Sequence, residues 1–447
     1  MKFQDLPDEV PFAFSLRFPL QNAIIKKKQR GPPMKELSRF LETSYTAYQA
    51  VDNARAYLLA HGFCELRETD AWELKPDGNY FAVRGGSALI AFRMGDARQG
   101  FKIVASHTDS PALKLKENPA LSDGNYTRLN TEPYGGGLWY TFFDRPLRLA
   151  GRVVREREGA LVSESFASDF PITLPSLAIH LNRNANEGFA PDKQKDLPVL
   201  ALGKSDFAAL LNAPVSYDLF AACAQSPYRW GENGEFLAAP RIDNLASVFA
   251  SLTTLSAGGT GVCVAACLDS EEVGSHTRQG AAGDFLRAVL ARIALRQNLT
   301  EEEQLCAYAR SFCISLDNAQ GFHPNHAEKY DPQDRAILGK GVAIKGHAGG
   351  AYTTDALSSA VIKRVFARAD APLQVFYNRS DARSGSTLGA ISLGQACILT
   401  VDIGLPQLAM HSAVETIACA DYEALEKGLA SFWTAEIRMD GETVTVR

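Results

Sequence analysis

The sequence predicts an α/β fold, a three-layer sandwich around a mainly parallel sheet, interrupted by a β-rich insertion. Apolar strands alternate with amphipathic helices before residue 117 and after residue 235, a pattern typical of a parallel sheet covered by helices. Residues 117–235 are turn-rich and aromatic, and their short alternating runs indicate β-structure. The chain has 447 residues, more than one hydrophobic core usually holds, so we expect more than one domain.

We divide the chain into four parts. Residues 1–33 contain the basic stretch "KKKQRGPP" and would be a loosely held arm, or an upstream start that the natural protein does not use. Residues 34–116 and 236–447 would form the two parts of the catalytic α/β domain, and residues 117–235 the inserted domain, which would mediate oligomerisation.

The expected elements follow in order. A strongly helical pattern covers residues 35–63, and short strands are predicted at 79–85, 88–94 and 101–109. After the insertion, helices are predicted at 243–257, 282–297, 353–369 and 422–437, and strands at 261–269, 310–317, 373–378 and 396–404.

Composition excludes several classes of protein. A net charge of −5 gives no basic patch for nucleic acid, and no apolar run is long enough to cross a membrane. The N-terminus lacks the features of a signal peptide. The eight cysteines form no CxxC pair or disulfide framework, and apolar neighbours indicate reduced core thiols. Cys263 and Cys267 would face the same side of a strand. A cytoplasmic location fits best.

Polar residues follow the ends of several apolar elements. In "CLDSEEVGSHT" (267–277), Glu271 and Glu272 come directly after a buried strand, where adjacent ionised carboxylates are costly unless a cation pairs with them. Because functional sites collect at the carboxyl ends of strands in an open α/β sheet, we expect one crevice to hold all of these residues. They are His107, Asp109, Asp243, Glu271, Glu272, Asp317 and His411.

This set predicts a metal site. Imidazole and carboxylate together suit Zn²⁺, Mn²⁺ or Co²⁺. More carboxylates are present than one zinc ion needs, which indicates two ions about 3.5–4 Å apart that share a carboxylate. Such a pair would be the cationic partner that Glu271 and Glu272 require.

A purely structural role is an alternative for each residue. The prediction of a metal site rests on the occurrence of all of these residues in one chain. His107 and His411 could be packed structural histidines, Asp243 a helix cap, Asp317 a turn residue, and Glu271 with Glu272 a solvated loop. His323 and His326 in "HPNH" are spaced for a metal on one helical turn, but Pro and Asn between them favour a loop, so we rank them lower.

Several blocks resemble the aspartyl aminopeptidase family of zinc metallopeptidases. In chain order they are "SHTDSPALKLK", "PRIDNLAS", "DSEEVGS", "SLDNAQGFHPNHAEKY", "GKGVAIK" and "GLPQLAMHSAVET". The resemblance runs from about residue 34 to the C-terminus, and "LAIHLNR" with "GFAPDKQKDLPVL" is similar to the family's inserted domain. Six blocks in this order are specific to the family.

The resemblance implies a role for each residue. His107 and Asp317 would bind one metal, Glu272 and His411 the other, Asp243 would bridge both, and Glu271 would be the general base. Asp109 would fix the orientation of the His107 ring. His180 would steady substrate or oxyanion from a neighbouring subunit, and Lys345 would pair with an acidic substrate side chain; a surface lysine is the alternative for Lys345.

The implied function is removal of N-terminal Asp or Glu from peptides with a free N-terminus, by two divalent ions in a large homo-oligomer, a dodecamer. An extended chain would place Glu271 toward the water and Glu272 toward the metal. Two stretches depart from the family pattern, "TSYTAYQAV" with Gln49 at a histidine position, and "SGSTLG" (384–389). These departures leave open a neutral-residue aminopeptidase or amidase on the same scaffold. A catalytically silent binding relative is a separate alternative, which loss of Glu271 or of a ligand would indicate, and all of these residues are present.

Overall fold

The structure is a computed structural model that describes residues 33–447 apart from residues 123, 203–206, 383–384 and 386–397. The predicted arm, residues 1–33, therefore lies outside the described residues except for Pro33, which begins the first helix.

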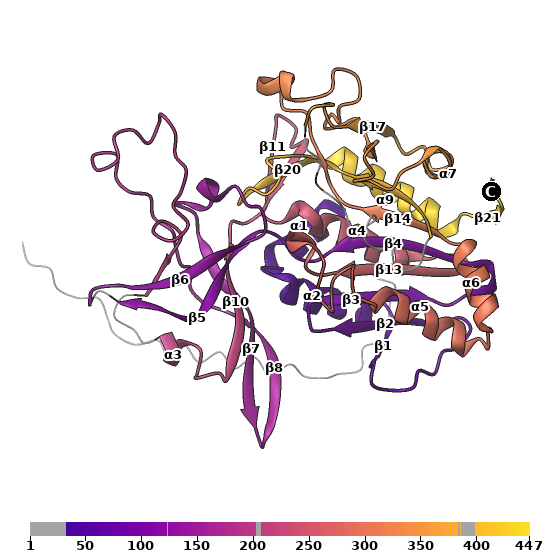
Figure 1. The fold of residues 1–447 in the computed structure, drawn as a ribbon, viewed down its shortest axis with the longest axis horizontal. Helices are drawn as coiled ribbons and strands as arrows, with labels where there is room; N and C mark the ends of the chain where they lie inside the picture. The colour runs from indigo at the N-terminus through magenta and orange to yellow at the C-terminus, as the bar shows by residue number, and fades with distance from the viewer. Residues whose placement is uncertain (1–32, 123, 203–206, 383–384, 386–397) are drawn as a thin grey trace, which may run out of the picture.

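A nine-stranded mixed sheet forms the centre of the larger part of the molecule (Figure 1). Its four middle strands, β13, β4, β14 and β18, are parallel, so their carboxyl ends lie at one edge. In spatial order the strands are β1 (Cys64–Leu66), β2 (Asn79–Arg84), β3 (Ala88–Arg93), β13 (Val262–Leu268), β4 (Phe101–His107), β14 (Phe312–Leu316), β18 (Leu399–Gly404), β16 (Val342–Gly346) and β17 (Leu373–Tyr377).

Helices cover both faces of this sheet, which confirms the predicted three-layer α/β class. Alternate residues of β13 divide between two cores: Cys263 and Cys267 belong to one, and Val264 to the other. The first core includes α1 (Pro33–Thr43), α2 (Ala47–Ala60), α4 (Ile242–Ala257), α7 (Ala356–Ala367) and α9 (Cys419–Thr434). The second includes α5 (Phe285–Arg296) and α6 (Glu301–Ala309).

The helical pattern at 35–63 folds as two helices, not one. The chain is extended at Thr46, whose side chain accepts a hydrogen bond from the Tyr48 N–H and so caps α2. The buried guanidinium group of Arg241 donates to the Ser44 carbonyl at 2.7 Å. This long-range contact fixes the break, and the local pattern of apolar residues could not predict it.

A six-stranded antiparallel sheet projects to one side (Figure 1), and it agrees with the β-structure predicted for the insertion. Along the chain, the strands of this sheet run from Ala112 to Cys223. The division of the chain into domains stays a prediction. The strands are β8 (Ala160–Ala167), β7 (Leu147–Arg157), β10 (Ser216–Cys223), β5 (Ala112–Ser122), β6 (Thr127–Tyr134) and β9 (Val199–Leu202).

Smaller sheets complete the described chain. A five-stranded sheet joins β11 (Tyr228–Trp230), β12 (Phe236–Ala239), β20 (Glu415–Ala418), β19 (Pro406–Leu408) and β15 (Ala319–Gln320). The other short elements are α3 (Phe207–Leu210), β21 (Ile437–Asp440) and β22 (Thr443–Val446), with 3₁₀ turns η1 (Ala97–Gln99), η2 (Trp139–Phe142), η3 (Glu271–Val273) and η4 (Pro324–Lys329).

The seven described cysteines form no disulfide, as the sequence predicts. Cys64 is exposed, so the expectation of core thiols fails at that position, while Cys397 lies outside the described residues. No helix in the described part of the chain is long and apolar enough to cross a membrane.

Candidate metal centre

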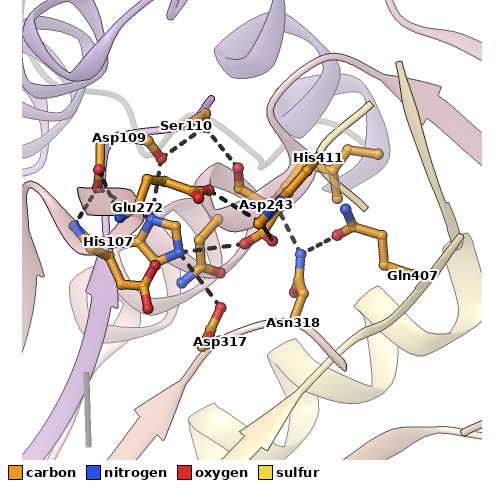
Figure 2. Close-up of polar contacts among 12 residues, drawn as sticks. His107, Asp109, Ser110, Asp243, Glu272, Asp317, Asn318, Gln407 and His411 are labelled. Atoms are coloured by element: carbon orange, nitrogen blue, oxygen red, sulfur yellow. Dashed lines mark hydrogen bonds and ion pairs between the residues drawn. The ribbon is translucent and has the colours of Figure 1, made fainter. Parts of the chain in front are cut away.

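The residues predicted from strand ends come together at one edge of the nine-stranded sheet (Figure 2). His107 ends β4, Asp317 directly follows β14, and these strands are parallel neighbours. Glu271 and Glu272 lie in η3, just after β13. Asp243 lies in the first turn of α4, and His411 lies in the loop between β19 and β20. Parallel pairing thus positions the strand-end residues, and the helix start and the loop supply the rest.

Asp243 lies between the two histidines. Its Oδ1 is 3.4 Å from His107 Nε2, and its Oδ2 is 3.6 Å from His411 Nε2. Asp317 Oδ1 is 3.5 Å from His107 Nε2, and Glu272 Oε1 is 3.4 Å from His411 Nε2. Two groups with one imidazole and two carboxylates each therefore share Asp243. Glu271 belongs to a third group with His107 and Glu272.

These donors fit a pair of divalent ions. Tetrahedral zinc holds nitrogen and oxygen ligands at about 2.0–2.2 Å, which separates neighbouring ligand atoms by roughly 3.3–3.6 Å. The measured separations lie in this range. Asp243 Oδ1 and Glu272 Oε1 are buried and accept no hydrogen bond within the described chain, although buried carboxylate oxygens are normally paired.

Both rings direct Nε2 toward the carboxylates. The Nδ1–H of His107 donates to the Asp109 carbonyl at 3.1 Å, and that of His411 donates to the Gly136 carbonyl at 3.2 Å. A carbonyl on Nδ1 selects the tautomer that leaves the Nε2 lone pair available to a metal.

Charge is crowded in this cluster. Burial raises the pKa of Glu271 to about 7 and that of Glu272 well above its usual value. Burial opposes charge on His411 also, but the hydrogen bond and charge of Asp243 raise its pKa to about 10. Asp243 shows the converse: burial acts to raise its pKa, and the two histidines hold it well below the usual range. Burial thus favours the protonated form of the two glutamates, while Asp243 stays ionised between the histidines. Divalent cations would take the place of protons in this cluster.

Comparison with known proteins identifies the family. The profile of the family described as "Aminopeptidase I zinc metalloprotease (M18)" matches residues 40–210 and 209–433. The chain belongs to the M18 family. The "Probable M18 family aminopeptidase 2" of Clostridium acetobutylicum is 39% identical over 423 residues, which cover 89% of this chain and 98% of that protein. The protein of the same name from Pseudomonas aeruginosa strain UCBPP-PA14 is 39% identical over 421 residues, covering 89% and 96%.

Solved structures agree. "Cryo-EM structure of the Ape4 and Nbr1 complex" has a TM-score of 0.85 and 32% identity, covering 89% of this chain and 85% of that one. "Crystal structure of prApe1" has a TM-score of 0.82 and 26% identity, covering 89% and 94%. The protein is therefore an M18 metallo-aminopeptidase, a hydrolase, and the predicted family is confirmed.

Asp109 holds the backbone of two residues of the M18 cluster. Its Oδ1 accepts the Glu271 N–H and its Oδ2 the Glu272 N–H, both at 3.1 Å, and Oδ2 also accepts the Tyr134 hydroxyl at 2.9 Å. One carboxylate thus holds the backbone of both glutamates. These glutamates lie in a 3₁₀ turn, so the expected extended chain is wrong, and both side chains reach the cluster.

Two parts of this M18 site were not predicted from the sequence, the turn at Gly135 and Gly136 and the side chain of Glu415. Gly135, at φ +75°, approaches Glu272 so closely that an added Cβ would lie 3.0 Å from the Glu272 Cβ. Gly136 accepts the His411 ring N–H. Three consecutive glycines after a strand were the available signal. The Glu415 carboxylate accepts hydrogen bonds from the backbone N–H groups of Asp243 and His411. No spacing pattern in the sequence indicates this role of Glu415.

Lys345 is buried, so the surface alternative is wrong. Its Nζ lies 3.2 Å from Asp317 Oδ2 and 3.3 Å from the Asn318 carbonyl, with the Tyr352 ring centroid at 5.0 Å. The cap interpretation of Asp243 fails as well, because its side chain faces the histidines: Oδ1 accepts no hydrogen bond within the described chain, and Oδ2 lies 3.6 Å from His411 Nε2. The side chain of Glu272 is 3% exposed, which excludes a solvated loop.

Other predicted residues lie away from the cluster. His180 is exposed in a turn between β8 and β9 and belongs to none of the metal-capable groups in the described chain. His323 and His326 lie at η4, a 3₁₀ turn where we expected a loop, and they form no such group there either.

Gln49 donates to the Gly151 and Phe166 carbonyls, so it joins α2 to the six-stranded sheet. Residues 384–389 lie outside the described residues except for Gly385.

Proposed function

We propose that this M18 protein is a dinuclear metallo-aminopeptidase that removes N-terminal residues from peptides, Asp and Glu above others. The observation that carries the proposal is the pair of histidine–carboxylate groups that share Asp243, with the half-buried Glu271 beside them. His107 and Asp317 would hold one ion and Glu272 and His411 the other.

Zinc is the proposed metal, and the same donors accept manganese or cobalt. Two bound ions would polarise the scissile carbonyl and acidify a water molecule. Glu271 would take a proton from the attacking water at its carboxylate and return it to the leaving amine nitrogen. Burial raises the pKa of Glu271 to about 7, which suits a group that must both accept and release a proton near neutral pH.

The remaining assignments rest on the resemblance. Lys345 is the proposed partner of an acidic substrate side chain, although its ammonium group is buried and already bonded to Asp317. His180 is the proposed oxyanion donor, supplied to the site of a partner subunit, and its exposure is compatible with that role. A solved structure with a related fold is the "Structure of S. cerevesiae mApe1 dodecamer", and we propose a homo-oligomer of that size. The proposed location is the cytoplasm, where the cysteines would stay reduced.

The test is release of the first residue from Asp-, Glu- and Leu-initiated peptides by metal-reloaded protein, with Glu271→Gln as the control. Glutamine keeps the shape of glutamate but cannot take a proton, so we expect at least a thousandfold loss of kcat while metal binding persists. Release of Leu alone would keep the hydrolytic mechanism and favour a neutral-residue enzyme. No release from any peptide, with metal bound, would favour an amidase or a silent binding relative.

A further inference from the structure

Glu415, the first residue of β20, connects two cluster residues from different parts of the chain. It is 2% exposed. Its Oε2 accepts the backbone N–H of Asp243 at 2.9 Å, and its Oε1 accepts that of His411 at 2.7 Å. Each carboxylate oxygen therefore holds one of the two residues whose side chains meet 3.6 Å apart.

The backbone at both residues is unusual. His411 lies in the left-handed region at φ +64°, which a residue with a Cβ adopts only where its surroundings hold it. Asp243 departs from helical geometry within the first turn of α4, after Arg241 at φ +58°. The hydrogen bonds to the Glu415 carboxylate oppose relaxation of the backbone at both places.

Glu415 belongs to none of the metal-capable groups in the described chain. It lines a cavity of about 270 Å³ between the nine-stranded and six-stranded sheets, together with Asp109 and Asp269. This cavity is not lined by any of the six residues of the metal-capable groups in the described chain, which are His107, Asp243, Glu271, Glu272, Asp317 and His411. Asp109 and Glu415 thus stand on the reverse side of the cluster, and each holds the backbone of two of its members.

We propose that Glu415 is a positioning residue that sets the affinity of the site formed by Asp243, Glu272 and His411 for a divalent cation. This proposal rests on the proposed function, because it requires the cluster to bind metal. The chemistry is specific: a carboxylate offers an acceptor oxygen to each of two N–H groups, whereas a carboxamide offers one oxygen and a donor NH₂. Both bonds that Glu415 accepts come from the site of His411 and the shared Asp243, so the site of His107 and Asp317 depends on it only through Asp243.

The experiment compares Glu415→Gln with a matched control, Asp421→Asn, by calorimetric titration of Zn²⁺ and Co²⁺ into metal-free protein. Asp421 is also fully buried and also accepts two backbone N–H groups, those of Gly339 and Gly341, each at 2.7 Å. The control therefore makes the same chemical change without touching a cluster residue. We expect two cations in the wild type and in Asp421→Asn, and at least a tenfold weaker affinity for one of them in Glu415→Gln.

The outcomes separate the two proposals. Wild-type protein that binds no divalent cation would overturn the proposed function. Two cations bound at wild-type affinity by folded Glu415→Gln would overturn the positioning role alone, and so would equal weakening in Asp421→Asn. If Glu415→Gln does not fold, Glu415→Asp takes its place. Aspartate keeps both carboxylate oxygens, but its side chain is one methylene shorter. The same selective weakening is expected, and wild-type affinity would overturn the role. The Co²⁺ absorption spectrum reports the changed ligand geometry independently of activity.

Discussion

The two halves of the metal cluster are built in different ways. In the half that we call the sheet half, His107 and Asp317 stand at the ends of adjacent parallel strands, with side chains 1% and 13% exposed. In the loop half, Glu272 lies in a 3₁₀ turn and His411 in a loop, and the His411 side chain is 31% exposed. The ladder of β4 and β14 fixes the sheet half, whereas contacts from Asp109, Gly136 and Glu415 hold the loop half.

The loop half is therefore the more easily disturbed of the two. Its geometry depends on the Gly136 carbonyl, the close approach of Gly135 and the carboxylate of Glu415. Each of these is a single contact, while the sheet half rests on backbone hydrogen bonds within the core. We therefore expect metal to leave the loop half first when chelator is added to the loaded protein.

The largest effect is expected where the halves meet. Asp243→Asn leaves one acceptor oxygen and no charge between the two histidines, so both cations should bind at least a hundredfold more weakly. kcat/KM should fall by at least a thousandfold. Metal content after dialysis, together with peptide hydrolysis, checks this. Retention of either ion at wild-type affinity would show that Asp243 does not serve both halves.

A smaller effect should separate the halves. Gly135→Ala places a Cβ 3.0 Å from the Glu272 Cβ and 3.3 Å from its Oε2, so the loop half should bind its cation more than tenfold more weakly while the sheet half is unchanged. Gly62→Ala is the matched control. Gly62 has a similar φ, +81°, but its Cβ would meet nothing within 4 Å. Calorimetric titration measures the cation affinity of both variants. An equal loss of affinity in Gly62→Ala would show that the contact with Glu272 is not the cause, and that backbone strain explains the loss.

The smallest effect concerns pH. Glu271 acts as a base only when ionised, and burial raises its pKa to about 7 in the metal-free protein. Bound cations favour the ionised form and lower that pKa. kcat/KM should therefore fall as the pH drops through a value at or below about 7, by about tenfold per unit below it. A pH–rate profile from pH 5 to 9 for the wild type and for the residual activity of Glu271→Gln checks this. An acidic limb that persists unchanged in Glu271→Gln would remove Glu271 from the role of base.

The sequence predicts the sheet half better than the loop half, for a physical reason. His107 and Asp317 follow strands whose apolar runs are visible in the sequence, and parallel pairing brings such ends together. The contacts of Gly135 and Glu415 depend on how the six-stranded sheet and β20 pack against the cluster, which no local pattern encodes. The break before Thr46 escapes prediction for the same reason, because Arg241, distant in sequence, holds it.

The order of the cluster residues along the chain has a consequence for biosynthesis. His107 and Asp317 of the sheet half, and the shared Asp243, are translated before His411, which completes the loop half. At about 5–20 residues per second, the interval between residues 317 and 411 lasts on the order of 5–20 seconds. All ligands proposed for the first ion are therefore translated several seconds before the last ligand proposed for the second.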